Sequence, residues 1–225
     1  MSTETAAACR TGAELREYLL NRLNLALRRP GMFGAEIALV ALGDAIAFAD
    51  RRESDWQAER DSLDARGASS AVGVLGTFTR ILPAGSRCDD AVASVYAELA
   101  HRCGWLKLDR ALSADEYARL RDELAVWGER DWSLSQVLAR LGQPSGFFGG
   151  TSAYYPKTIA YGTACGDDPL VCFHLWNSVD LGAPGELRSV YPEPMLMAVR
   201  HGDGPFLDTF TFTPEGAVRR PGGSE

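Results

Sequence analysis

The stretch LVCFHLWN, residues 170–177, holds the side chains whose types and spacing are best suited to chemistry. Cys172, His174 and Trp176 alternate with apolar residues, and this period of two predicts a β-strand with one apolar and one amphipathic face. A thiol beside an imidazole is the pair that thiol hydrolases use as nucleophile and base. Side chains at i and i+2 of a strand, however, stand about 6 to 7 Å apart, too far for a direct hydrogen bond. A mid-strand thiol also lacks a helix N-terminus to lower its pKa, so the sequence favours a binding surface over catalysis.

We expect the amphipathic face of this strand to be open to solvent and to form a binding surface with the preceding loop. That loop, GFFGGTSAYYPKT, offers Tyr154, Tyr155 and Lys157, whose rings and charge suit contact with a partner or a ligand ring. Its paired glycines lack the spacing and the Lys-Ser/Thr pair of a phosphate-binding P-loop, so no nucleotide site is predicted. Phe147 and Phe148 are expected to fill the gap between the helical and β parts of the chain.

Titratable residues also gather near the C-terminus, where His201, Asp203 and Asp208 surround a predicted turn. These residue types suit an acid/base cluster, although the turn alone accounts for Asp203. Asp208 is therefore kept as a candidate residue for a site where the helical and β parts meet. The five cysteines form no CxxC pair, and with the histidines they do not reach four zinc ligands at a recognisable spacing. We predict no metal and no cofactor.

The hexapeptide RPGMFG, residues 29–34, resembles a stretch near the start of gyrase-type ATPase domains. That resemblance would imply an ATP site, with an acidic residue and an asparagine on the next helix and a glycine-containing nucleotide loop beyond it. The next helix offers Asp44 but no asparagine beside it, and no DGxG-like loop follows. The sequence therefore predicts a turn, in which Pro30 and Gly31 end one helix and Gly34 begins the next.

Apolar residues recur at spacings of three and four over most of residues 1–142, which predicts a helical region. The segment 35–52 is apolar nearly all round and is predicted to be the most buried helix, while 68–85 is compatible with a helix or a strand. Three pairs have the spacing of a capping box, namely Thr11 with Glu14, Ser113 with Glu116 and Ser133 with Gln136. The predicted helices are 14–29, 35–52, 54–66, 89–105, 113–129 and 133–142.

From about Gly142 the pattern changes to short runs of period two, separated by turns such as GDDP and GDGP. These runs predict an antiparallel β-meander over residues 143–216, and residues 217–225 are predicted to be a disordered tail. The chain is thus expected to be α+β, with an N-terminal helical bundle packed against the C-terminal meander in one compact unit. The predicted strands are 157–165, 170–177, 194–201 and 206–213.

The composition limits the classes of partner that the protein can bind. The 225 residues include 30 acidic and 23 basic ones, for a net charge of −7. This balance argues against nucleic acid and anionic membranes, and it permits a basic protein partner. All but two of the basic residues are arginine, which is typical of a bacterial, high-GC coding sequence. Scattered cysteines and the lack of a long apolar run predict a cytoplasmic protein.

Two functions from different classes agree with these features. The first is a non-enzymatic acidic protein that binds another protein, of the immunity-like, antitoxin-like or accessory-factor kind; the missing catalytic motifs and the aromatic β surface favour it. The alternative is a small cytoplasmic enzyme with its site at the seam between the helical and β regions, where concave sites often form. No catalytic residue is assigned, and the candidate binding residues are Tyr154, Tyr155, Lys157, His174, Trp176 and Asp208.

Overall fold

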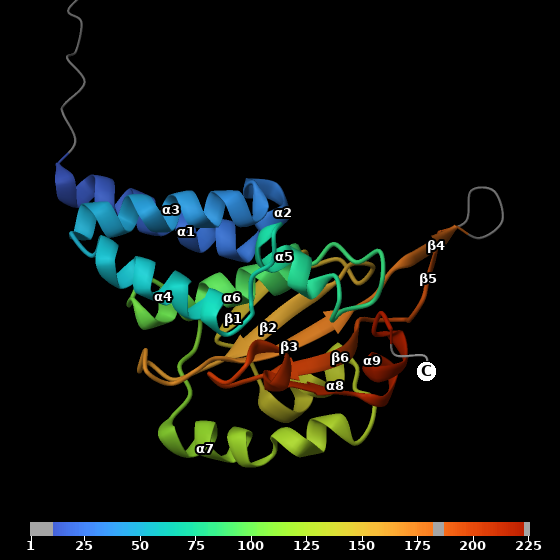
Figure 1. Ribbon diagram of the computed structural model, residues 1–225. Helices are drawn as coiled ribbons and strands as arrows, with labels where there is room; N and C mark the ends of the chain where they lie inside the picture. The colour runs from blue at the N-terminus through green and yellow to red at the C-terminus, as the bar shows by residue number, and fades with distance from the viewer. Residues whose placement is uncertain (1–10, 182–186, 223–225) are drawn as a thin grey trace, which may run out of the picture.

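A five-stranded antiparallel sheet organises the fold, and helices cover both of its faces (Figure 1). The computed structural model describes residues 11–181 and 187–222. Neighbouring strands follow one another in the order β1-β2-β3-β6-β7, which confirms the predicted α+β class and the antiparallel meander. The strands are β1 (Gly146–Gly149), β2 (Lys157–Tyr161), β3 (Val171–Trp176), β6 (Met195–Arg200) and β7 (Phe210–Phe212).

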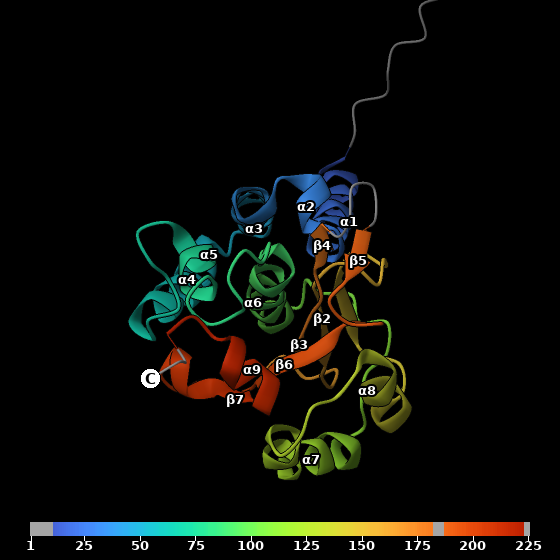
Figure 2. The ribbon, with the colours of Figure 1, turned by 90° about the vertical axis from the view of Figure 1, so that its right-hand side faces the viewer.

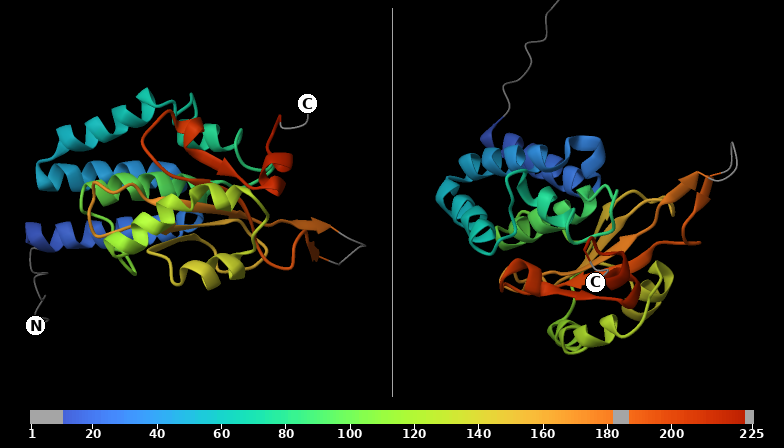
Figure 3. Two further views of the ribbon diagram at one scale, coloured as in Figure 1. Left: turned by 90° about the horizontal axis from the view of Figure 1, so that it is seen from below. Right: turned by 45° about the vertical axis from the view of Figure 1, so that its right-hand side comes forward.

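A separate two-stranded hairpin interrupts the meander between β3 and β6. It consists of β4 (Val179–Leu181) and β5 (Leu187–Ser189), and it projects away from the sheet at one end of the molecule (Figure 3). No strand is predicted from the sequence of this glycine-containing, acidic stretch. The hairpin pairs only with itself, so it extends the chain without adding to the main sheet.

The first face of the sheet is covered by the helices of the N-terminal region. The first of them begins at Thr11, whose side chain accepts a hydrogen bond from the Glu14 backbone N–H, as the capping box predicted. The single turn α2 confirms that the RPGMFG hexapeptide is a turn, which Gly34 closes with a φ of 95°. These helices are α1 (Gly12–Arg28), α2 (Pro30–Phe33), α3 (Ala35–Asp50), α4 (Glu53–Ala65), α5 (Gly73–Phe78) and α6 (Asp89–Arg102).

Helix α6 is the central helix of this layer. Every residue from Asp90 to His101 is buried, because α6 lies between the α1/α3 pair and the sheet (Figure 2). The prediction that 35–52 would be the most buried helix is therefore wrong. Helix α3 belongs to the outermost layer, where only one of its sides meets other helices.

The second face of the sheet is covered by α7 (Ala114–Asp122), the 3₁₀ helix η1 (Leu124–Gly128) and α8 (Leu134–Leu141) (Figure 1). Trp127 and Trp132 pack there against Phe173, with the rings of Trp127 and Phe173 edge to face at 4.9 Å. The expected single helical bundle is thus divided between both sides of the sheet. Both faces of β3 consequently lie in the core.

The C-terminal segment differs from its predicted form in two places. The predicted strand 206–213 begins as the 3₁₀ helix η2 (Phe206–Thr209), and only β7 is extended. The tail expected from 217 is helical through residue 219, because Thr213 caps α9 (Pro214–Arg219) and Pro214 stands at its first position. Residues 223–225 lie outside the described residues. The ambiguous segment 68–85 contains the short helix α5 between turns.

Candidate functional site

The amphipathic face of β3 is not open to solvent, contrary to the expectation from the sequence. Cys172 is fully buried, and His174 and Trp176 are only 1% and 8% exposed. The first helical layer covers this face: the His174 ring packs against Phe78 from α5 and Phe210 from β7, at ring-centre distances of 5.4 and 5.8 Å. The proposed open surface on β3 therefore does not exist.

Cys172 has none of the features of an activated nucleophile. Burial raises the pKa of its thiol to about 11, and the Arg200 guanidinium donates to its Sγ at 3.3 Å. Its hydrogen-bonding partner is thus an arginine rather than His174. A thiolate is the reactive form of cysteine, so the raised pKa speaks against the Cys-His pair as catalytic groups.

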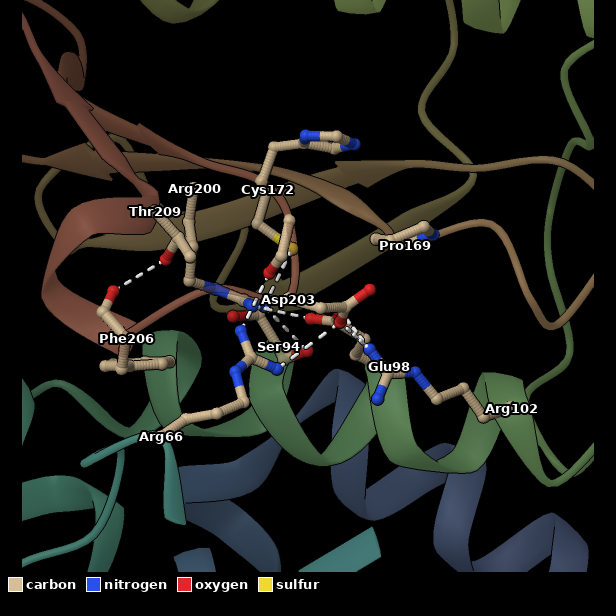
Figure 4. Close-up of polar contacts among 12 residues, drawn as sticks. Arg66, Ser94, Glu98, Arg102, Pro169, Cys172, Arg200, Asp203, Phe206 and Thr209 are labelled. Atoms are coloured by element: carbon tan, nitrogen blue, oxygen red, sulfur yellow. Dashed lines mark hydrogen bonds and ion pairs between the residues drawn. The ribbon is translucent and has the colours of Figure 1, made fainter. Parts of the chain in front are cut away.

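Arg200 belongs to a buried ion-pair cluster between α6 and the sheet (Figure 4). Its Nη1 lies 2.5 Å from Oε2 of Glu98, and Arg102 contacts the other oxygen of Glu98 at 3.2 Å. Arg102 and Arg66 both pair with Asp203 after β6, where the cluster reaches the surface. Every charge in the cluster has an opposite partner. We interpret it as a structural link between α6, the end of α4 and β6.

A cleft with a volume of about 620 Å³ lies where the first helical layer meets the sheet. We call it the seam cleft. Its volume falls in the range of ligand and peptide-side-chain sites. Its walls come from α2, from the loop before α6 and the start of α6, from the β1–β2 loop, and from the end of β3. The lining residues are Pro30, Gly31, Met32, Ala84–Arg87, Asp89, Asp90, Gly149, Gly150, Tyr154–Pro156 and Trp176–Val179.

The helical wall of the cleft carries two adjacent carboxylates. Asp89 and Asp90 are the first residues of α6, where the helix dipole favours negative charge. Arg87 on the preceding loop is the one basic residue among the lining residues. The α2 turn closes this side, and Arg29 holds it against the sheet by donating to the Gly149 carbonyl oxygen. The charge of this wall is therefore net negative.

The sheet wall of the cleft carries three aromatic rings. Tyr154 and Tyr155 are exposed in the β1–β2 loop, and Trp176 ends β3 beside them. Two buried side chains hold the loop in place. Asn177 donates to the Ala153 carbonyl oxygen at 2.7 Å, and the Lys157 ammonium donates to the Gly150 carbonyl oxygen at 3.0 Å.

A chain of three buried polar groups runs from the cleft into the core. The Thr158 hydroxyl lies 2.8 Å from Oδ2 of Asp90 and 3.0 Å from Nδ1 of His174. Because the hydroxyl donates its single proton to the Asp90 carboxylate, its oxygen accepts from Nδ1–H of His174. Burial raises the pKa of Asp90 to about 7, and it lowers the pKa of His174 well below the usual range. Within this chain of hydrogen-bonded groups, the Asp90 carboxyl can therefore gain or lose a proton near neutral pH.

The structure brings most of the candidate residues together at this cleft. Tyr154, Tyr155 and Trp176 line it, while Lys157 and His174 lie behind its walls and support the lining groups. Asp208 does not belong to it. It lies exposed in η2, a segment that bonds to the end of α4 through the Phe206 N–H and the Arg66 carbonyl oxygen.

The acidic wall of the cleft is not predicted from the sequence. In the sequence, Asp89 and Asp90 look like ordinary acidic residues at the start of a helix, where the helix dipole alone accounts for negative charge. Asp90 differs from an ordinary acidic residue at a helix start because it is buried. This burial results from the packing of α6 on β2, which a local sequence pattern does not show. The expectation for Phe148 agrees with the structure, because this ring is buried with the residues of the first helical layer. Phe147 packs instead on the opposite face of the sheet.

Comparison with protein-family models, with curated proteins and with solved structures finds no match to this chain. Among the described residues, no helix has both the length and the apolar character needed to cross a bilayer. The described part of the chain also has no group of three or more His, Cys, Asp or Glu side chains placed to hold a metal ion.

Proposed function

We propose that this protein binds another protein by taking a basic side chain of its partner into the seam cleft. The observation that carries this proposal is the pairing of two walls: Asp89 and Asp90 on one side, and Tyr154, Tyr155 and Trp176 on the other. Carboxylates attract a cation, and aromatic faces stabilise it further once water is excluded. The net charge of −7 means that the molecule as a whole also attracts cationic partners.

Arginine suits this cleft better than lysine. A guanidinium is planar, forms two parallel hydrogen bonds to a carboxylate and stacks on aromatic rings. The protein already uses Trp176 in this way, because the Arg219 guanidinium lies 4.8 Å from the centre of its ring. The incoming side chain would therefore stack on the two tyrosines and pair with Asp89 or Asp90.

The surroundings of the cleft favour a macromolecular partner. Tyr154, Tyr155 and Met32 are exposed around it, and interfaces are enriched in tyrosine, methionine and arginine. A partner chain would cover these rings, which a small cation would leave in water. This role includes the immunity-like, antitoxin-like and accessory-factor kinds of protein. The cytoplasm is the compartment we propose, since the four described cysteines are unpaired thiols.

An array of arginine-containing peptides tests this function. The matched control array replaces each arginine with citrulline, which keeps the shape of the side chain and removes its charge. We expect the protein to retain arginine peptides selectively, and we expect Asp89→Asn and Tyr155→Ala to reduce that binding. Leu207→Ala changes an exposed residue outside the cleft and should leave the binding unchanged. Equal retention of arginine and citrulline peptides would overturn the proposal.

A second candidate function is an enzyme that uses Asp90 as a general acid or base. The pKa of about 7 favours it, because proton transfer is most efficient when the catalytic pKa lies near the working pH. A panel of chromogenic ester, amide, phosphate and glycoside substrates tests this role. Turnover that Asp90→Asn abolishes, in a variant whose cooperative melting curve shows that it is folded, would support the enzyme. The absence of turnover across the panel, together with selective arginine binding, would favour the binding protein.

A further inference from the structure

The outer face of α3 carries large apolar side chains although it faces solvent. Ile37 and Phe48 are 84% and 75% exposed, and the exposed residues Ala41 and Asp44 lie between them. These four positions follow spacings of four, three and four, which place them in one stripe along the helix. We call Ile37, Ala41, Asp44 and Phe48 the α3 stripe. Large apolar side chains gathered on one exposed face are typical of an interaction surface.

Two hollows lie beside the stripe, along the groove between α1 and α3. One has a volume of about 890 Å³ and includes Leu15, Ala45 and Phe48. The other has a volume of about 290 Å³ and includes Arg22 and Ala41. The α1/α3 pair forms the outermost layer of the molecule, so no other described element covers this groove (Figure 2).

We propose that a second copy of this chain covers this face, with the two α3 helices antiparallel across a two-fold axis. The spacing of the stripe is the same in both directions along the helix. Antiparallel pairing about its centre therefore places Ile37 opposite Phe48 of the second copy, and Ala41 opposite Asp44. The two large apolar residues cover each other at both ends, and the small Ala41 lets the helices approach closely. A self-complementary patch of this kind is what an isologous dimer requires.

The charges of the face are complementary in this arrangement. Asp44 of one copy would lie opposite Ala41 of the other, and Arg22 lines the same hollow as Ala41. Each Asp44 would thus come close to an arginine of the second copy, in addition to its own Arg60 at 3.3 Å. The two-fold axis repeats this pairing, so the interface would contain two such contacts. A parallel arrangement would instead place like residues opposite one another.

The size of the face indicates a reversible dimer. The 16 residues of α3 give a helix of about 24 Å, and the α1/α3 pair is about 20 Å wide. One copy would contribute roughly 480 Å², for about 960 Å² in total, which is near the lower limit for a specific interface. The stripe shares no residue with the seam cleft, so the dimer would leave both clefts accessible.

Sedimentation velocity over a wide range of protein concentration tests this inference. We expect the wild-type protein to shift from monomer to dimer as its concentration rises, and Ile37→Glu and Phe48→Glu to remain monomeric. Leu207→Glu and Val218→Glu introduce the same charge at exposed apolar residues of other elements, so they should dimerise like the wild type. A wild-type protein that stays monomeric at every concentration would overturn the proposal, as would a dimer that persists in both stripe variants.

A charge-reversal pair tests the arrangement itself. Arg22→Asp places a carboxylate near Asp44 of the second copy and should weaken the dimer. Adding Asp44→Arg restores opposite charges across the axis and should recover dimerisation, provided that melting curves show a folded monomer. Melting is measured because Asp44 also accepts a hydrogen bond from Trp56 Nε1 at 2.7 Å. A folded double variant that is weaker than Arg22→Asp alone would contradict the antiparallel arrangement.

Discussion

The Thr158 hydroxyl donates a 2.8 Å hydrogen bond to the Asp90 carboxylate, and this bond joins strand β2 to the first turn of α6 beneath the seam cleft. His174 lies on the other side of the same hydroxyl, 3.0 Å from it. In this chain of three hydrogen-bonded groups, Asp90 can ionise near neutral pH, whereas His174 stays neutral in the core. The stability of the fold therefore depends on the protonation of Asp90, and so does the affinity for a cation that we propose for the cleft.

The first prediction concerns the pH dependence of stability in Asp90→Asn. Burial raises the pKa of Asp90 in the folded protein to about 7, above the ordinary value of 3.8, so between these two pH values the folded state keeps a proton that the unfolded state has lost. Asp90 therefore makes stability fall as pH rises from about 4 to about 7. We expect Asp90→Asn to remove this fall, as measured by urea unfolding at a series of pH values. A difference between variant and wild type that is constant over this window would contradict the prediction.

The second prediction concerns His174, for which the sign is opposite. Burial holds the pKa of His174 in the folded protein well below the ordinary value of 6.5, so below pH 6.5 the unfolded state binds a proton that the folded state excludes. His174 therefore stabilises the fold above pH 6.5, and this contribution is lost as pH falls below that value. We expect His174→Gln to flatten the loss at acid pH, relative to the wild type, even where the variant is less stable overall. An unchanged acid slope would show that His174 is protonated in the folded protein.

The third prediction concerns the buried pair of Glu98 and Arg200. Glu98→Gln removes one charge and leaves the Arg200 guanidinium without a full countercharge, so it should cost about 3 to 5 kcal/mol of unfolding free energy. The double variant Glu98→Leu/Arg200→Met removes both charges and should cost less than Glu98→Gln alone. Asp203→Asn, at the exposed end of the cluster, is the control and should cost less than about 1 kcal/mol. A double variant that is less stable than Glu98→Gln would indicate that the pair contributes net stability.

The fourth prediction concerns Gly43 in the middle of α3. Glycine to alanine in a helix normally adds up to about 1 kcal/mol of stability. An added Cβ at Gly43, however, would lie 2.2 Å from the Trp56 ring, so Gly43→Ala should destabilise the protein, by about 1 to 3 kcal/mol. At Gly12, also in a helix, the added Cβ meets nothing within 4 Å, and Gly12→Ala should be neutral or stabilising. Gly43→Ala should therefore melt at a lower temperature than the wild type, and Gly12→Ala at the same or a higher temperature.

Local signals in the sequence predicted local structure well. Thr11, Ser113 and Ser133 cap their helices as expected, because a capping box depends only on residues three positions apart. The predicted alternation of side chains between the two faces of β3 is also correct, since strand geometry determines which side chains share a face.

The predictions that were wrong concern features that depend on contacts between segments far apart in the sequence. The pattern of β3 shows two faces but does not show that α6 and α5 cover one of them and η1 the other. The Ala-rich α6 carries a weaker apolar signal than α3, yet its central position buries it. Asp90 and Tyr155 both line the seam cleft although they are 65 positions apart in the chain. No local rule places such a pair together.

The most direct test of the seam cleft is calorimetric titration with the best arginine peptide, one pH unit below and one above the Asp90 pKa of about 7. We predict tighter binding at the higher pH, because Asp90 is then ionised, and no such gain for Asp90→Asn. Affinity that is the same at both pH values in the wild-type protein, and unchanged in Asp89→Asn and Asp90→Asn, would contradict a cation site in this cleft.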